Sequence, residues 1–224
     1  MFGWGRRKNE PEFVRNYCAS TGRKFDRKRS FGEIPFVALD AETTGFDINK
    51  DRLLSIGIVP LNQGALDVAN RQTWLVQQAA SPNNEAVKIH GIAPSESAKG
   101  IPEAQVLEEL LAAISGKVIV GHHIGFDAEI IGNGLRRNFG IKFRNRMIDT
   151  SMMAMRHLDA FHRTGYANQR PPGLDEVCVH AGLPVLGRHT ASGDAFTTGQ
   201  LFLWICGRLR VRYGRQLVAG DLLK

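Results

Sequence analysis

The fold of this chain is decided by the stretch IPFVALDAE, residues 34–42. Its apolar part, Ile34 to Leu39, is typical of a central β-strand, and Asp40 and Glu42 follow directly. Residues two apart on a strand point to the same face, where an apolar strand has no packing reason to place two carboxylates. The simpler alternative for such a pair is two exposed loop acids after a strand that ends at Leu39.

Two further strands are predicted after these acids. Residues 52–60 and 71–77 are rich in β-branched and aromatic side chains, and the turn-like Asn62-Gln63-Gly64 separates them. Short links between consecutive strands favour an antiparallel meander. We therefore expect three neighbouring strands, with the acids at the end of the first.

The rest of the chain alternates between helical and strand patterns. After a stretch rich in Pro, Gly and Ser (residues 81–102), residues 103–114 have helical apolar spacing. The pattern predicts an α/β fold in which helices flank both sides of a sheet of mixed direction. The further expected elements are strands at 117–120 and 147–148 and helices at 126–139, 150–158, 174–181 and 191–212.

Length and composition indicate one main domain. The chain has 224 residues, 43% hydrophobic and 23% charged, which is ordinary for a soluble globular protein. The three cysteines, Cys18, Cys178 and Cys206, form no C-x-x-C pair, so we expect a reducing compartment and neither a disulfide framework nor a zinc site. No secretory signal follows Met1, and the longest apolar run is too short to span a bilayer. We expect a cytoplasmic protein without a membrane partner.

The net charge of +7 is concentrated near the N-terminus, where residues 1–30 hold nine Lys and Arg against three Asp and Glu. We therefore divide the chain into a basic N-terminal arm (1–33), with one short helix expected around residues 12–20, a main domain (34–212) and a short C-terminal tail (213–224). A basic arm suits the phosphates of nucleic acid. It is equally consistent with a solvated tail that aids solubility.

Two more segments carry chemistry of their own. Residues 43–46, Thr-Thr-Gly-Phe, combine hydroxyls, a glycine that permits close backbone approach to a ligand, and an aromatic ring that can stack on a base. Residues 121–127, GHHIGFD, place Asp127 beyond a buried strand at the start of a helix. Taken alone, Asp127 is more simply explained as an acid that complements the helix dipole.

The last such segment, residues 188–195, sets His189 and Asp194 five apart where a loop enters a helix. A histidine there can lean over a site that the aspartate helps to build. The pattern is common and carries little meaning by itself. Its value comes from the order and context of all three acidic segments.

Together these segments resemble the DEDDh branch of the DnaQ-like exonuclease superfamily, which includes polymerase proofreading subunits, DNases and RNases. The resemblance covers residues 35–207: the three motifs are 40–45, 121–127 and 189–194, and the family also shows His-Gly-Ile (90–92) and Ile-Asp-Thr (148–150). It implies the ribonuclease-H-like fold, a five-stranded mixed sheet with helices on both sides. It also implies 3′-to-5′ exonuclease activity on single-stranded ends.

The resemblance further implies a two-metal-ion site for Mg²⁺ or Mn²⁺, ions that prefer oxygen ligands. Asp40 would bridge both ions, Glu42 and Asp194 would complete one, and Asp127 would support the other. His189 is then the general base, since the pKa of histidine is ordinarily near neutrality.

The terminal nucleotide, by the same resemblance, contacts Thr43 and the backbone of Thr44 and Gly45. The pocket lining is assigned to four rings: Phe46, His90, His122 and Phe126. For each of these rings, a core or ordinary surface role is an equally good explanation. Asp149 is expected only to cap the following helix.

Several functional alternatives remain at this point. The substrate is a single-stranded DNA or RNA 3′ end; DNA is slightly favoured, in proofreading or repair, but an RNA-trimming exoribonuclease fits the same motifs. A noncatalytic nucleic-acid-binding or polymerase-accessory module is the alternative from another class. A polymerase or another protein is a candidate partner for the N-terminal arm.

Overall fold

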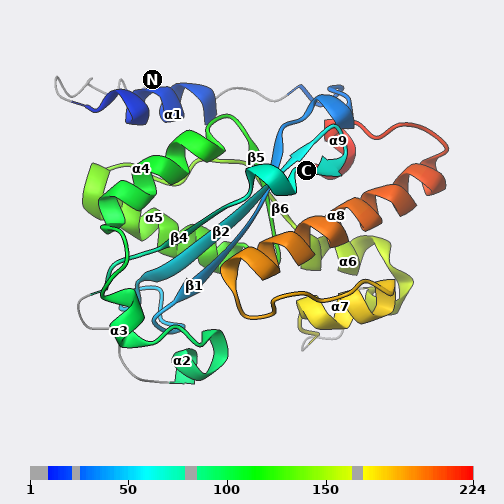
Figure 1. Cartoon of the computed structure of the whole chain (residues 1–224). Helices are drawn as coiled ribbons and strands as arrows, with labels where there is room; N and C mark the ends of the chain where they lie inside the picture. Colours follow the sequence, from blue (N-terminus) through cyan, green and yellow to red (C-terminus); the bar gives the residue numbers. More distant parts are fainter. Residues whose placement is uncertain (1–9, 22–25, 79–84, 163–168, 224) are drawn as a thin grey trace.

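The computed structural model describes residues 10–21, 26–78, 85–162 and 169–223, which form one mixed sheet between two layers of helices (Figure 1). The sheet order is β3-β2-β1-β5-β6, and β4 pairs with β2 on the side away from β1. The strand bounds are β1 Phe36–Thr43, β2 Leu53–Asn62, β3 Ala65–Leu66, β4 Gln72–Leu75, β5 Val118–Gly121 and β6 Met147–Asp149.

The central strand β1 explains why the sheet is covered on both faces. It pairs antiparallel with β2 and parallel with β5, which in turn pairs parallel with β6. Phe36 and Ala38 belong to one buried cluster, and Val37 and Leu39 belong to the other. This alternation shows that both faces of the sheet are buried, as the predicted fold class requires. The antiparallel pairing of β1 with β2 and of β2 with β4 confirms the predicted meander. The additional sixth strand, β3, is only two residues long and follows the turn at residues 63–64.

The helical layers match the two buried clusters. The layer that includes Phe36 and Ala38 contains α6 (Thr150–His157), α7 (Leu174–Ala181), α8 (Ala191–Tyr213) and α9 (Ala219–Leu222). The opposite layer contains α1 (Glu12–Thr21), α4 (Glu103–Ile114) and α5 (Gly125–Phe139). The long helices therefore lie within a residue or two of the predicted ranges, because their apolar faces repeat over several turns.

Short elements were missed by the sequence prediction. The two helices α2 (Glu85–His90) and α3 (Pro94–Ser97) lie within the stretch rich in Pro, Gly and Ser, residues 81–102, for which no element was predicted. Elements of six and four residues have too few turns to show a helical period. Three 3₁₀ turns, η1 (Phe31–Glu33), η2 (Val68–Asn70) and η3 (Asp159–Phe161), complete the described elements.

The long helix α8 lies close against the sheet. At Gly199 an added side-chain carbon would come within 2.6 Å of Leu66 and 3.3 Å of Ala38. The buried residues of α8, among them Leu201, Phe202 and Ile205, extend the same contact. The sheet therefore fixes the position of α8, including its first turn.

Part of the predicted arm is folded onto the domain. In α1, Val14 and Tyr17 are fully buried against the layer that contains α4. The Tyr17 hydroxyl donates to Asn145 Oδ1 at 2.7 Å and accepts the N–H of Arg144 at 2.8 Å, and burial raises its pKa to about 12. Five basic residues of the predicted arm lie outside the described residues: Arg6, Arg7, Lys8, Arg23 and Lys24.

The predicted C-terminal tail, residues 213–224, also contributes to the core where it is described. Leu217, Ala219 and Leu222 are buried in the cluster of α8, and the N–H of Ala219 donates to the Arg29 carbonyl at 2.9 Å. None of the described helices combines the length and apolarity that a membrane crossing requires.

Candidate active site

The first two acids are part of the strand. Because β1 continues to Thr43, Asp40 lies opposite Gly57 of β2 and Glu42 lies opposite Ser55. Both side chains are half-buried and, being two apart, share one face of the sheet. The alternative in which the strand ends at Leu39 is therefore wrong.

Three carboxylates meet at this face. One oxygen from each of Asp40, Glu42 and Asp194 lies within 4.8 Å of the other two. Asp194 is 4% exposed and lies in the first turn of α8, whose N-cap Thr190 accepts the N–H of Gly193 at 3.2 Å. The partial positive charge of this helix end reduces the repulsion among the acids only in part.

The fourth acid, Asp127, is tied to the same strand from the neighbouring helix. It lies in the first turn of α5, is 6% exposed, and accepts the N–H of Ala41 at 3.2 Å through Oδ1. Its charge is among the causes that raise the pKa of Asp40. The structure therefore brings all four predicted acids into one electrostatic group, of which three share the short oxygen distances.

Burial and mutual repulsion dominate the electrostatics of this group. Burial and then the charges of Asp127, Asp194 and Glu42 raise the pKa of Asp40 well above its ordinary range. Burial and the charge of Asp194 raise the pKa of Glu42 to about 7, and burial raises the pKa of Asp127. Such a group is stabilised when a cation lies among the carboxylates.

The donor set suits a hard divalent cation. The four acids offer only oxygen atoms, which Mg²⁺ and Mn²⁺ prefer. The Oδ1 atom of Asp194 is buried and has no hydrogen-bond partner among the described residues, although buried polar atoms are normally paired. This unpaired oxygen is the observation that best supports a metal ligand here.

His189 stands at the edge of the carboxylate group. Its side chain is exposed, its backbone is in the left-handed region (φ 62°), and its N–H donates to Asp194 Oδ2 at 3.1 Å. A residue other than glycine in this region is strained, and such strain concentrates at functional sites. The bond to Asp194 therefore holds the histidine beside the acids.

Arg188 is a site residue to which the sequence interpretation gave no role. Its Nη1 donates to Asp194 Oδ2 at 2.6 Å, and its Nε donates to Asp175 Oδ1 at 2.7 Å. The same Nη1 lies 3.5 Å from His189 Nδ1. The available signal was its position directly before the histidine, but its partner Asp175 could not be found from local sequence.

Two of the predicted pocket rings lie together. The ring centroids of Phe46 and Phe126 are 6.5 Å apart, and Phe46 is 72% exposed, which is unusual for so large an apolar side chain. An exposed aromatic ring of this kind can stack on a base.

The hydroxyl groups of Thr43 and Thr44 form hydrogen bonds with the segment that connects β1 to β2. Thr43 Oγ1 donates to the Gly45 carbonyl at 2.7 Å, and Thr44 Oγ1 donates to Asp51 Oδ1 at 2.7 Å. Asp51 also accepts the N–H of Asp47 at 2.8 Å, so it organises the loop although the sequence analysis did not single it out. All three residues from Thr43 to Gly45 are buried.

The two predicted pocket histidines differ. His90, at the end of α2, is 8% exposed, and its Nδ1 accepts the N–H of Ile92 at 3.0 Å. Burial lowers the pKa of His90, and a hydrogen bond with the backbone of Thr43 opposes this shift. His122 has both ring nitrogens engaged, with Thr150 Oγ1 at 2.9 Å and the Pro172 carbonyl at 2.9 Å. Burial lowers the pKa of His122 to about 4. His122 therefore connects parts of the fold, and a nucleotide would have to displace one of these partners to reach its ring nitrogens.

Asp149 is a capping acid, as predicted. Its Oδ1 accepts the N–H of Ser151 at 2.9 Å at the start of α6 and the N–H of His123 at 3.2 Å. These bonds explain its position near the acids without a metal-binding role.

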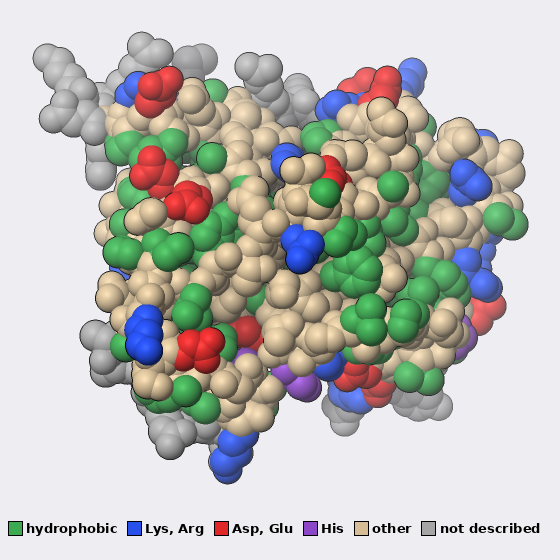
Figure 2. Space-filling view, in the orientation of Figure 1, with side chains coloured by type: hydrophobic (Ala, Val, Ile, Leu, Met, Phe, Trp, Pro, Cys, Tyr) green, Lys and Arg blue, Asp and Glu red, His purple; other side chains and the backbone are tan. Residues whose placement is uncertain are grey.

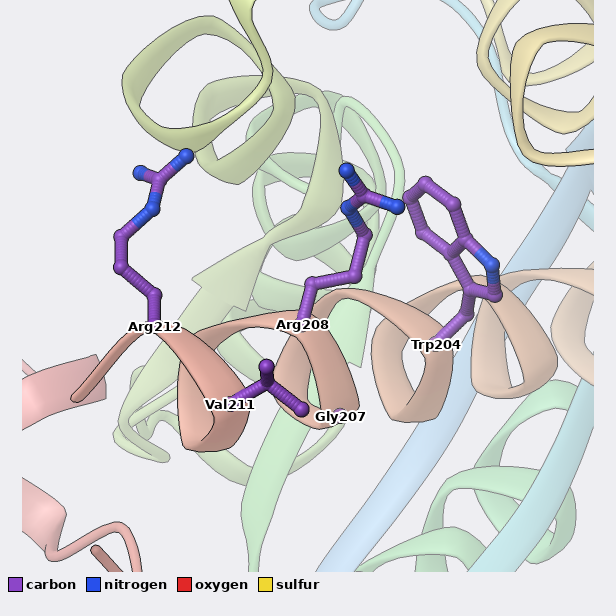
Figure 3. A pocket seen from close by; sticks show the side chains of 5 residues that line it. All are labelled: Trp204, Gly207, Arg208, Val211 and Arg212. Atoms are coloured by element: carbon purple, nitrogen blue, oxygen red, sulfur yellow. The ribbon is translucent and has the colours of Figure 1, made fainter. Parts of the chain in front are cut away.

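Exposed apolar side chains and a hollow lie on α7 and α8, apart from the residues of the predicted site. On the face shown in Figure 2, hydrophobic side chains gather over the region of α7 and α8, where Val179 and Val211 are largely exposed. Figure 3 shows a hollow lined by Trp204, Gly207, Arg208, Val211 and Arg212, with the Arg208 guanidinium 4.9 Å from the Trp204 ring centroid. None of these residues belongs to the predicted site.

The sequence matches the family described as exonuclease over residues 37–202. It is 29% identical over 183 residues to a DNA polymerase III PolC-type protein of Thermotoga maritima, covering 81% of this chain but 12% of that protein. It is 26% identical over 179 residues to the DNA polymerase III subunit epsilon of Aquifex aeolicus, covering 80% of this chain and 84% of that subunit. The chain therefore spans about an eighth of the PolC-type relatives.

A solved structure shares the fold. E. coli Exonuclease I in complex with a dT13 oligonucleotide superposes with a TM-score of 0.66 at 20% identity, covering 81% of this chain and 43% of that one. At this identity the similarity supports the fold alone, and it agrees with the ribonuclease-H-like architecture predicted from the motifs.

Proposed function

Because this chain belongs to the exonuclease family, we propose that it hydrolyses single-stranded nucleic acid from the 3′ end, releasing nucleoside monophosphates in a reaction that requires divalent metal. The observation that carries the proposal is the close group of carboxylate oxygens of Asp40, Glu42 and Asp194, with Asp127 bonded beside them and Asp194 Oδ1 unpaired.

The acids have a defined role in this proposal. Asp40 would contact both of two Mg²⁺ or Mn²⁺ ions, Glu42 and Asp194 would complete the ligands of one, and Asp127 would support the other. When bound, the ions supply charge stabilisation to the attacking and leaving oxygens of the phosphodiester. The raised pKa values of Asp40 and Glu42 are consistent with carboxylates arranged for a cation.

His189 is proposed as the general base. It removes a proton from the attacking water and, being exposed at the edge of the carboxylate group, can pass that proton to solvent. The N–H of His189 on Asp194 Oδ2 couples the position of the base to that of a proposed metal ligand.

The terminal nucleotide is proposed to lie between the acids and the exposed ring of Phe46. Phe46 and Phe126 would stack on the base, while Thr43 and the backbone of Thr44 and Gly45 would contact the rest of the terminal nucleotide. His90 is a further candidate contact because it is buried and interacts with the backbone of Thr43, another residue proposed to bind the nucleotide. For His122 we propose a supporting role next to the nucleotide, because Thr150 and Pro172 engage both its ring nitrogens.

DNA is our proposed substrate in preference to RNA. The named relatives are DNA polymerase III proteins, and the similar solved structure holds a dT13 strand. A role in proofreading or repair, with a polymerase or another protein bound through residues 1–33, extends the same proposal. An RNA-trimming enzyme and a noncatalytic nucleic-acid-binding module are the competing functions.

The test uses 5′-labelled single-stranded DNA and RNA of one sequence, each with a free or a phosphorylated 3′ end, in Mg²⁺, Mn²⁺ or EDTA. We expect a ladder that shortens from the 3′ end, faster on DNA, and abolished by EDTA. If the RNA strand is shortened faster than the DNA strand, RNA is the preferred substrate and the proposal of DNA is rejected. Strand binding without shortening in either metal would favour the noncatalytic module.

A further inference from the structure

Arg188 bridges two helices at the edge of the carboxylate group. Its Nε donates to Asp175 in the first turn of α7, and its Nη1 donates to Asp194 in the first turn of α8. The Asp194 side chain is 6% exposed, whereas that of Asp175 is 54% exposed. Asp175 thus lies outside the group but is connected to it by one side chain.

The two carboxylate oxygens of Asp194 differ in their hydrogen-bond partners. Oδ2 accepts both the Arg188 guanidinium, at 2.6 Å, and the N–H of His189, at 3.1 Å. Oδ1 accepts no hydrogen bond from the described residues. A carboxylate free to rotate would exchange these oxygens, so the two donors on Oδ2 set which oxygen remains available.

The Arg188 guanidinium can orient Asp194 only if a second hydrogen-bond partner fixes its own position. Its donors have a fixed planar arrangement, so a partner on Nε sets the plane in which Nη1 lies. Asp175 is that partner among the described residues, at 2.7 Å, and as a carboxylate it accepts a charge-assisted bond roughly twice as strong as a neutral one.

We propose that Asp175 is a positioning residue for the nuclease reaction, acting through Arg188 to hold Asp194 with Oδ1 presented to the metal. The inference rests on the proposed function for its metal, but its test does not require turnover. Groups that orient a ligand in this way typically change metal affinity by about 10- to 100-fold when they are replaced.

The test measures Mn²⁺ affinity by isothermal titration calorimetry, with free Mn²⁺ followed by electron paramagnetic resonance. Asp175→Ala removes the acceptor of the Arg188 Nε–H together with one negative charge, whereas an asparagine oxygen could still accept that bond, and we expect Mn²⁺ to bind about tenfold more weakly. The matched control is Glu176→Gln, which removes the same charge one residue later. Glu176 pairs with Arg170 at 2.6 Å, and the glutamine oxygen can still accept the N–H of Gly173. The control should bind Mn²⁺ like the wild type.

A double-mutant cycle separates positioning from a direct charge effect. Arg188→Gln removes both an orienting donor and a positive charge, so its own effect has two opposing parts and is used only as a background. In that background, Asp175→Ala should change Mn²⁺ affinity by less than about threefold, because residue 188 no longer connects position 175 to Asp194.

Two results would overturn the inference. One is an unchanged Mn²⁺ affinity in Asp175→Ala; the other is a tenfold loss that persists in the Arg188→Gln background. Either can occur while the wild type digests DNA, which would leave the proposed function standing. A wild type that binds Mn²⁺ but digests no strand would reject the proposed function, while the coupling between Asp175 and Arg188 would still be measurable.

Discussion

A side-chain carbon on Gly57 would lie 2.3 Å from the carbonyl oxygen of Ala191. Gly57 pairs with Asp40 across β1 and β2, and Ala191 begins α8. The absence of a side chain at this point lets the first turn of α8 rest directly on the strand beside Asp40. The contact thereby brings Asp194 to the other carboxylates.

Replacing Gly57 should therefore affect both the fold and the site. Gly57→Ala forces α8 away from β2, and overpacking of this kind costs about 1–3 kcal/mol. We expect a lower midpoint of chemical denaturation and a nuclease rate reduced at least about tenfold, since small displacements of catalytic groups are costly.

The matched control is Gly207→Ala, in the same helix, where an added carbon meets nothing within 4 Å. Alanine should raise stability there by up to about 1 kcal/mol, because glycine is unfavourable inside helices. Wild-type activity and stability in Gly57→Ala would show that the close contact is not needed.

The carboxylate group predicts an unusual pH dependence in the absence of metal. The pKa of Glu42 rises from 4.5 to about 7 in the folded chain, so the folded state binds more protons than the unfolded state in this window. The contribution of Glu42 to stability is therefore present below about pH 4.5 and is lost as the pH rises through about 7.

Glu42→Gln removes this titration together with the repulsion by which the charge of Glu42 raises the pKa of Asp40 and Asp127, and both changes act in the same direction. His122 acts in the opposite direction between about pH 4 and 6.5, because burial lowers its pKa, but it is present in both proteins. Urea denaturation in EDTA should show the variant gaining stability relative to the wild type from pH 4.5 to 7. A difference that does not change with pH would contradict the raised pKa.

His122 should behave as a structural residue. Replacing it by alanine removes its bonds to Thr150 and Pro172 and leaves buried groups unpaired, which costs about 1–3 kcal/mol. We expect a lower melting temperature together with lower activity. The control His123→Asn keeps a residue that tolerates the left-handed backbone at φ 57° and should melt like the wild type.

A different result would assign His122 to the substrate instead. If His122→Ala melts normally and only KM for the strand rises, the ring contacts the nucleotide directly. Thermal melting and steady-state kinetics on the same preparations distinguish the two outcomes.

The exposed ring of Phe46 should contribute to strand binding and not to folding. Stacking on an aromatic ring is worth about 1–3 kcal/mol per base, so Phe46→Ala should weaken binding of a single-stranded end by about tenfold or more. Fluorescence anisotropy in Ca²⁺ measures this without turnover. The control Val179→Ala removes another exposed apolar side chain, 77% exposed on α7, and should leave binding unchanged. Equal binding by the wild type and Phe46→Ala would remove Phe46 from the nucleotide site.

Much of the fold could be predicted from the sequence because its signals are local and long. The apolar run before Asp40 and the periodic faces of residues 103–114 and 191–212 each extend over enough residues to define an element. The four acids could be assigned because their motifs stand in one order, and their meeting at the end of β1 agrees with that assignment.

The parts that were missed depend on partners far apart in the sequence. Tyr17 gives no local sign that it bonds to Asn145, so the helix at 12–21 could be expected but its packing against the domain could not. The local sequence also does not indicate that Thr150 and Pro172 engage both ring nitrogens of His122. The role of Arg188 likewise depends on Asp175, thirteen residues earlier, which only the packing of α7 near α8 reveals.

The most direct test of the central claim compares wild type, Asp40→Asn and Asp159→Asn on 5′-labelled single-stranded DNA in Mg²⁺. Asp159 is an exposed acid away from the carboxylate group and serves as the control. We expect Asp40→Asn to lose at least about a thousandfold in rate, because charge stabilisation by bound metal contributes several kcal/mol, while circular dichroism shows an intact fold. Asp159→Asn should shorten the strand like the wild type. A folded Asp40→Asn that digests DNA at the wild-type rate would contradict the claim that these carboxylates form the active site.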